Sequence, residues 1–192
     1  INYGEVAAFF NFEFVNDISD KNYLLKTISD RKLQLEKITG VSVYGIYPSI
    51  NVLSENILQT FIASDYKYFI SDSLDDRSVP KTIKRKNEKI ISMSRTVRDD
   101  YDVIRDFNLI ERDFQFYSYQ EDVDRIAFES GLYLYKIHLD YQCSQQNISV
   151  VRDLIHDIKS KDYWIATASE IADWSDKKEF VELRTQKRGS SR

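Results

Sequence analysis

Residues 131–174 read GLYLYKIHLDYQCSQQNISVVRDLIHDIKSKDYWIATASEIADW, and the expected architecture follows from this stretch. Its first run, residues 131–138, is apolar and aromatic, begins at a glycine and leads into a polar loop, as is typical of a strand. His138 and Asp140 stand at the end of this predicted strand. They are therefore candidates for a site.

The rest of the same stretch alternates between helix-like and strand-like patterns. After Asn147 the apolar residues keep the spacing of one helical face, and residues 163–167 form a second strand-like run. Thr167 and Glu170 then have the spacing of a capping box, which predicts the start of another helix. The order strand, helix, strand, helix is the unit of a parallel α/β sheet or barrel, in which sites lie at the carboxyl ends of the strands.

The preceding part of the chain continues this alternation. The predicted strands there are residues 5–12, 41–47, 66–70 and 89–93, and helices are predicted over residues 19–38, from Ser54 and from Ser118. Residues 74–87 carry many charges and are predicted to be a long loop. Strand ends in such a fold share one mouth, where we expect Asn11, Glu13, Tyr47, Ser71, Asp72, Asp99, His138 and Asp140.

Composition limits the classes of function. The 192 residues are 42% hydrophobic, enough for one domain with a full core. The net charge of −4 is spread along the chain, which lacks the concentrated basic footprint of a nucleic-acid-binding protein. Cys143 is the single cysteine and cannot form an internal disulfide, so a metal site would need carboxylates. No run has the length and apolarity of a membrane span or a signal peptide, and the chain is expected to be part of a longer protein.

Three sets of residues have alternative interpretations. His138 is either a catalytic acid or a histidine that is satisfied by hydrogen bonds at a strand end, and we favour the second. Asp99, Asp100 and Asp102 could form a carboxylate site, but such a run is more often a solvated turn, or an anchor for Arg95 and Arg98. Trp164 and Trp174 are expected in the core rather than stacked on a sugar.

Four segments carry a resemblance to a known family. They are GEVAAFF (residues 4–10) with the helix end KLQLEKITG (32–40), VSVYGIYPSIN (41–51) with SDYKYFISDS (64–73), GLYLYKIHLD (131–140) and YWIATASEIADW (163–174). Together they resemble the polysaccharide deacetylase family with the NodB-homology fold, carbohydrate esterase family four. The resemblance implies a distorted parallel (β/α) barrel over residues 1–183, without its first strand or strands, followed by a polar tail over residues 184–192.

The resemblance also implies a divalent metal, usually zinc, that activates water against an acetyl group. The usual parts are an aspartate pair after the first strand, an H-x-x-x-H motif, an R-x-P loop and a late L-x-H histidine. The aspartate pair falls before Ile1, Phe9 and Glu13 occupy the two histidine positions, and Ile46 or Tyr47 occupies the arginine position. His138 matches the late histidine. The metal-binding motif is therefore expected to be degenerate, without a bound cofactor.

Three hypotheses follow. The first is a catalytically degenerate scaffold or carbohydrate-interaction module within a larger envelope or glycan-processing protein, with Glu13, Tyr47, Asp72 and Asp140 as substrate-binding candidates. The second is an active, metal-dependent deacetylase with a rearranged site in which His138, Asp99 and Asp100 are catalytic. The third is a partner-binding α/β domain, because the 13 tyrosines and 11 phenylalanines are compatible with an interface. The family resemblance alone favours a bacterial envelope or extracytoplasmic location.

Overall fold

The computed structural model describes residues 5–12, 19–49, 53–72, 79–85, 88–95 and 98–185. The chain divides into two compact units. Unit 1 comprises residues 1–72, 80–93 and 166–192, and unit 2 comprises residues 73–79 and 94–165. Each unit is described by itself.

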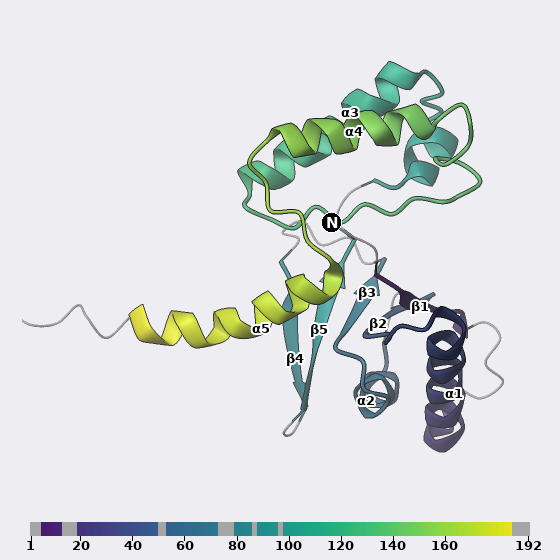
Figure 1. Cartoon of the computed structure of the whole chain (residues 1–192), viewed down its shortest axis with the longest axis vertical. Helices are drawn as coiled ribbons and strands as arrows, with labels where there is room; N and C mark the ends of the chain where they lie inside the picture. Colours follow the sequence, from purple (N-terminus) through teal and green to yellow (C-terminus); the bar gives the residue numbers. More distant parts are fainter. Residues whose placement is uncertain are drawn as a thin grey trace, which may run out of the picture. The chain divides into compact units, whose positions relative to one another are not determined.

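Unit 1 is built on a five-stranded sheet with the order β1-β2-β3-β5-β4 (Figure 1). The strands are β1 (Ala7–Phe10), β2 (Gly45–Pro48), β3 (Tyr68–Ser71), β4 (Lys81–Arg85) and β5 (Glu88–Ser94). β1, β2 and β3 are parallel, as predicted, whereas β4 and β5 form an antiparallel hairpin. The sheet is therefore mixed rather than wholly parallel.

Two helices, α1 (Lys21–Thr39) and α2 (Glu55–Ala63), pack on one face of this sheet. Asp20 caps α1 by accepting from the backbone N–H groups of Asn22 and Tyr23, and Gly40 ends it with φ 71°. The helix boundaries predicted from Gly40 and Ser54 are thus confirmed. The shared core contains Ala8, Phe10, Leu24, Ile28, Ile46, Ile57, Leu58, Phe61, Phe69 and Ile90.

The last helix, α5 (Ala168–Thr185), begins at the predicted capping box. Thr167 N–H donates to the Glu170 carboxylate at 2.7 Å, and Glu170 N–H donates to Thr167 Oγ1 at 3.2 Å. Glu5 accepts from Ser169 N–H at 2.9 Å, which connects this helix start to the segment before β1. α5 continues to Thr185, and residues 186–192, within the predicted tail, lie outside the described part.

Gly45 is required by a close approach between β2 and β3. A Cβ at this position would lie inside the van der Waals contact distance of the Tyr68 ring. Tyr68 is 1% exposed, and its hydroxyl donates to Glu5 at 3.0 Å, so the ring cannot move aside without losing contacts. We expect Gly45→Ala to lower the free energy of unfolding by about 1–3 kcal/mol, as overpacking does, in a urea titration.

The matched control for this substitution is Gly40→Ala. A side chain at Gly40 meets no atom within 4 Å, so only its positive φ is unfavourable. Adding Tyr68→Leu should therefore recover part of the stability lost in Gly45→Ala and none of that lost in Gly40→Ala. Equal recovery in both would contradict the steric explanation.

Unit 2 contains a short π-helix, η2 (Tyr101–Asp106), and two longer helices, α3 (Arg112–Phe128) and α4 (Ile148–Ser160). The helical spacing predicted after Asn147 is confirmed by α4, whose Val150 and Leu154 are buried. α3 begins at Arg112, six residues before the predicted start at Ser118, and Ser118 is buried inside it. The core of unit 2 consists of Val103, Tyr119, Val123, Val150 and Leu154.

Two predicted strands are absent from the described structure. Residues 131–138 and 163–167 are not assigned to any strand, although their composition is β-like. Strand formation requires a hydrogen-bonded neighbour, which sequence composition does not supply. Trp164 is 61% exposed and Trp174 is 45% exposed, so the core placement predicted for both is wrong.

Conversely, β4 lies within the segment predicted as a charged loop. Its register pairs Thr82 with Ile91 and Ile83 with Ile90. β4 is the last strand in the sheet order, and charged side chains, especially lysine, are common on such edge strands. Within the described residues, no helix has the combination of length and apolarity needed to cross a bilayer.

Candidate functional site

The carboxyl ends of β1, β2 and β3 carry an aromatic pair beside a carboxylate. Ala8 and Phe10 of β1 are buried on the side of α1 and α2, so the alternation of the strand places Phe9 on the opposite face. The Phe9 ring is 63% exposed and stacks on Tyr47 of β2, with centroids 5.6 Å apart and an interplanar angle of 23°. The Tyr47 hydroxyl donates to Asp72, directly after β3. We call Phe9, Tyr47 and Asp72 the aromatic platform.

Ser49 forms hydrogen bonds between the segment after β2 and the end of β1, next to the aromatic platform. Its hydroxyl donates to Asn11 Oδ1 at 2.9 Å and accepts from Phe12 N–H at 3.0 Å. Ser49 N–H also donates to Phe10 O at 3.0 Å. These bonds hold the segments after β1 and β2 against each other, so that the platform rests on a fixed backbone.

The residues of this site do not fit the metal that the resemblance implies. Phe9 has no lone pair to donate, and a catalytic zinc generally needs three protein ligands. Within the ranges that the structure describes, no group of three or more His, Cys, Asp or Glu side chains is arranged to hold a metal ion. Glu13, the other residue at a histidine position of the motif, lies outside the described residues.

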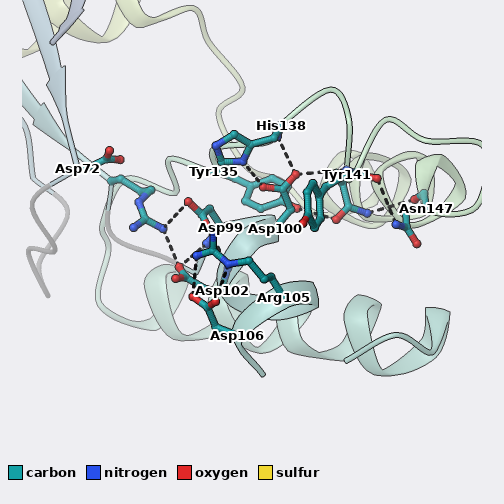
Figure 2. Close-up of polar contacts among 12 residues, drawn as sticks. Asp72, Asp99, Asp100, Asp102, Arg105, Asp106, Tyr135, His138, Tyr141 and Asn147 are labelled. Carbon is teal, nitrogen blue, oxygen red and sulfur yellow. Dashed lines mark hydrogen bonds and ion pairs between the residues drawn. The ribbon is translucent and has the colours of Figure 1, made fainter. Parts of the chain in front are cut away.

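Unit 2 contains a buried aspartate–histidine pair (Figure 2). Asp100 is completely buried and its carboxylate lies 2.5 Å from His138 Nδ1. The same carboxylate accepts from His138 N–H at 2.7 Å and from Gln142 N–H at 3.3 Å. Because a carboxylate accepts, we assign the proton to Nδ1, which leaves Nε2 without a proton on a side chain that is 21% exposed.

The His138 ring is also fixed from its face. Tyr101, the first residue of η2, stacks on it with centroids 3.5 Å apart and an interplanar angle of 3°. Arg105 lies over the Tyr101 ring at 4.8 Å. Burial is the main cause of the raised pKa of Tyr101, and the charge of the exposed Asp140 adds to it.

Asp99 has a different role from Asp100. Asp99 Oδ1 accepts from Asp102 N–H, Asp102 Oδ2 accepts from Asp99 N–H, both at 2.9 Å, and Arg95 pairs with both carboxylates. Burial opposes ionisation of Asp102, but the hydrogen bonds from Arg95 and from Asp99 N–H lower its pKa below the usual range. The predicted solvated turn is wrong, because Asp99 and Asp100 are 5% and 0% exposed and the run anchors Arg95.

Arg98, which could also have been anchored by this run, pairs with another carboxylate. Its guanidinium donates to Asp122 of α3 at 3.0 Å and to Ser118 O at 2.9 Å. The hydrogen bond to Asp122 is the main cause of the raised pKa of Arg98. This contact therefore secures α3 and carries no catalytic group.

The predicted site residues thus form two groups. Tyr47 and Asp72 are joined in unit 1, and Asp100 is joined to His138 in unit 2. Asp140, two residues after His138, is exposed. A single mouth shared by all of them stays a prediction. Sequence reasoning missed Phe9 as an exposed ring and Tyr101 as a stacking partner. The alternation of β1 could have indicated the first, whereas no local signal marks the second.

Comparison with solved structures identifies the fold. A Mycobacterium smegmatis protein assigned as a polysaccharide deacetylase matches with a TM-score of 0.70 and 17% identity, over 84% of this chain and 59% of that one. Puue allantoinase matches with a TM-score of 0.64 and 13% identity, over 85% and 55%. A Pseudomonas aeruginosa PAO1 protein assigned as a polysaccharide deacetylase has a TM-score of 0.63 and 15% identity, over 85% and 55%.

The chain therefore has the α/β fold of the NodB-type polysaccharide deacetylases, as the resemblance implied. It spans 59% of the length of the first of these structures and 55% of the other two. No protein-family model matches the sequence, and no curated protein matches it significantly. The likeness describes the fold, and the activity has to be argued from the two groups of residues.

Proposed function

We propose that this chain is a polysaccharide-deacetylase-like domain that binds a glycan on its aromatic platform and has lost metal-dependent deacetylation. The observation that carries this proposal is Phe9. It occupies a motif position at which the resemblance calls for a metal-binding histidine, and it presents an exposed ring stacked on Tyr47. In this proposal the domain is a carbohydrate-interaction module or scaffold of a larger envelope or glycan-processing protein.

The chemistry of the platform suits a sugar. The C–H face of a pyranose is apolar and packs well against an aromatic ring, while its hydroxyls need a few fixed polar partners. The Asp72 carboxylate, which accepts from Tyr47, offers acceptor atoms beside the rings. Covering an exposed phenyl ring with a ligand makes the free energy of binding more favourable, because apolar surface is removed from water.

A second candidate function is hydrolysis by general acid–base chemistry, and the Asp100–His138 pair supports it. A buried carboxylate that fixes a histidine by its Nδ1–H, with Nε2 left to exchange protons, is the arrangement of a catalytic acid or base.

One experiment separates the two candidates. The protein would be titrated with chitohexaose and cellohexaose by calorimetry, and acetate release from acetylated chitooligosaccharides would be followed with and without added Zn²⁺. We expect binding of an oligosaccharide and no acetate above the rate without protein, with or without metal. Without a bound cation the attacking water keeps the high pKa of bulk water, so the metal-dependent reaction should be negligible.

The opposite results are equally informative. Acetate release that is lost in His138→Gln would establish the second candidate and overturn the proposed loss of activity. Absence of both binding and release for the neutral oligosaccharides would overturn the glycan-binding proposal and favour the partner-binding hypothesis.

A further inference from the structure

Gln142 is a fully buried amide whose side chain is surrounded by hydrogen-bond partners. Its Oε1 accepts from the hydroxyls of Tyr119 at 3.0 Å and Tyr135 at 3.4 Å, and its Nε2 donates to Asn147 O at 3.1 Å. Burying an amide is costly unless its polar atoms are bonded, and here both are. Figure 2 shows Tyr135, Asn147 and the Asp100–His138 pair in the same region of unit 2.

The tyrosines are suited to their role as donors. Burial raises the pKa of Tyr119 and of Tyr135 far above neutrality, so both hydroxyls keep their protons. Their rings lie 4.8 Å apart and pack against each other. The Tyr119 hydroxyl, at 3.0 Å, is therefore the nearer donor to the amide oxygen, and the Tyr135 hydroxyl is also hydrogen-bonded to Tyr119.

The backbone of Gln142 connects this network to the acid–base pair. Its N–H is shared between His138 O at 3.0 Å and Asp100 Oδ2 at 3.3 Å. The bonds of the side chain set the orientation of this peptide group, because they hold the residue on both sides. The carboxylate that receives the N–H is the one that holds His138 Nδ1.

We infer that Gln142 is a positioning residue, which acts through Asp100 to hold His138 in its Nδ1–H tautomer. The inference rests on the second candidate function for its biological meaning, since a histidine that transfers protons through Nε2 needs the Nδ1–H tautomer. Its test concerns the histidine itself and does not depend on any hydrolytic activity.

The chain contains only two histidines, which makes the measurement direct. In two-dimensional ¹H–¹⁵N NMR of the ¹⁵N-labelled protein, His138 should be in the Nδ1–H form. Gln142→Met keeps the shape of the side chain without its polar atoms. Without its side-chain hydrogen bonds, Gln142 should no longer hold its N–H against Asp100. We expect the ratio of Nδ1–H to Nε2–H at His138 to fall about fivefold, which corresponds to the loss of that one hydrogen bond. His156, which is exposed on α4, should not change and serves as the internal reference.

Two further variants keep the test decisive. Tyr119→Phe removes one donor to Oε1 and leaves the ring, so it should shift His138 in the same direction but less, even if Gln142→Met fails to fold. Gln120→Met alters a neighbouring half-buried glutamine that bonds Asp157, and it should leave His138 unchanged. An unaltered His138 tautomer in folded Gln142→Met or in Tyr119→Phe, or an equal shift in Gln120→Met, would overturn the assignment. The glycan-binding proposal would be unaffected by either result.

Discussion

Replacing Phe9 with alanine is expected to weaken oligosaccharide binding by roughly tenfold to a hundredfold. A fully covered phenylalanine contributes about 1.5–3 kcal/mol, and each 1.4 kcal/mol corresponds to a factor of about ten in affinity. The Phe9 ring is 63% exposed, so most of it is available to a sugar, and little of the core depends on it. Calorimetric titration with the oligosaccharide bound by the wild-type protein measures the effect.

The control for this prediction is another exposed phenylalanine. Phe128, at the end of α3, is 92% exposed and belongs to unit 2, so Phe128→Ala should bind as the wild-type protein does. Phe9→Trp keeps a flat ring and should retain binding. If Phe9→Ala bound as tightly as the wild-type protein, or if Phe128→Ala lost affinity equally, the platform would not be the binding site.

The parts of the fold that were predictable depend on neighbours in the sequence. Asp20 caps α1, Gly40 ends it, and Thr167 with Glu170 opens α5, and each of these signals acts within a few residues. The period of two along β1 likewise depends only on local alternation. Such features can be read from a few consecutive residues.

The strand predictions that failed depend on distant partners. Residues 131–138 have a strand-like composition, yet composition cannot indicate whether a neighbouring strand pairs with them. β4 shows the opposite case, because its charges indicate a loop while its pairing with β5 makes it a strand. Both errors arise because hydrogen bonding in a sheet is a property of two segments and not of one.

The site was only partly predictable, because its contacts also join residues that are distant in the sequence. His138 was a candidate because it follows an apolar run, but Asp100 is 38 residues away, and a run of acids is usually solvated. A buried carboxylate needs hydrogen-bond donors, and those of Asp100 are His138 and Gln142, which lie far from it in the sequence. A cluster of charges in sequence therefore says little about which member is desolvated.

Asp100→Ala is expected to be the most destabilising substitution among those considered for unit 2. The carboxylate is 0% exposed and accepts from two N–H groups, in addition to its contact with His138 Nδ1. Removing it leaves His138 N–H and Nδ1–H without this acceptor, whereas Gln142 N–H keeps its hydrogen bond to His138 O. Each donor left unsatisfied costs about 1–3 kcal/mol. Asp100→Asn retains one acceptor oxygen and should cost less.

Urea unfolding followed by circular dichroism would rank these variants against Asp106→Ala. Asp106 is exposed and pairs with Arg105 on the surface of η2, where a solvated ion pair adds little to stability, so its loss should leave the unfolding midpoint unchanged. The expected order of destabilisation is Asp100→Ala, then Asp100→Asn, then Asp106→Ala. If Asp100→Ala unfolded at the same urea concentration as Asp106→Ala, the two His138 donors would have found other partners, and Asp100 could not be the residue that holds His138 in place.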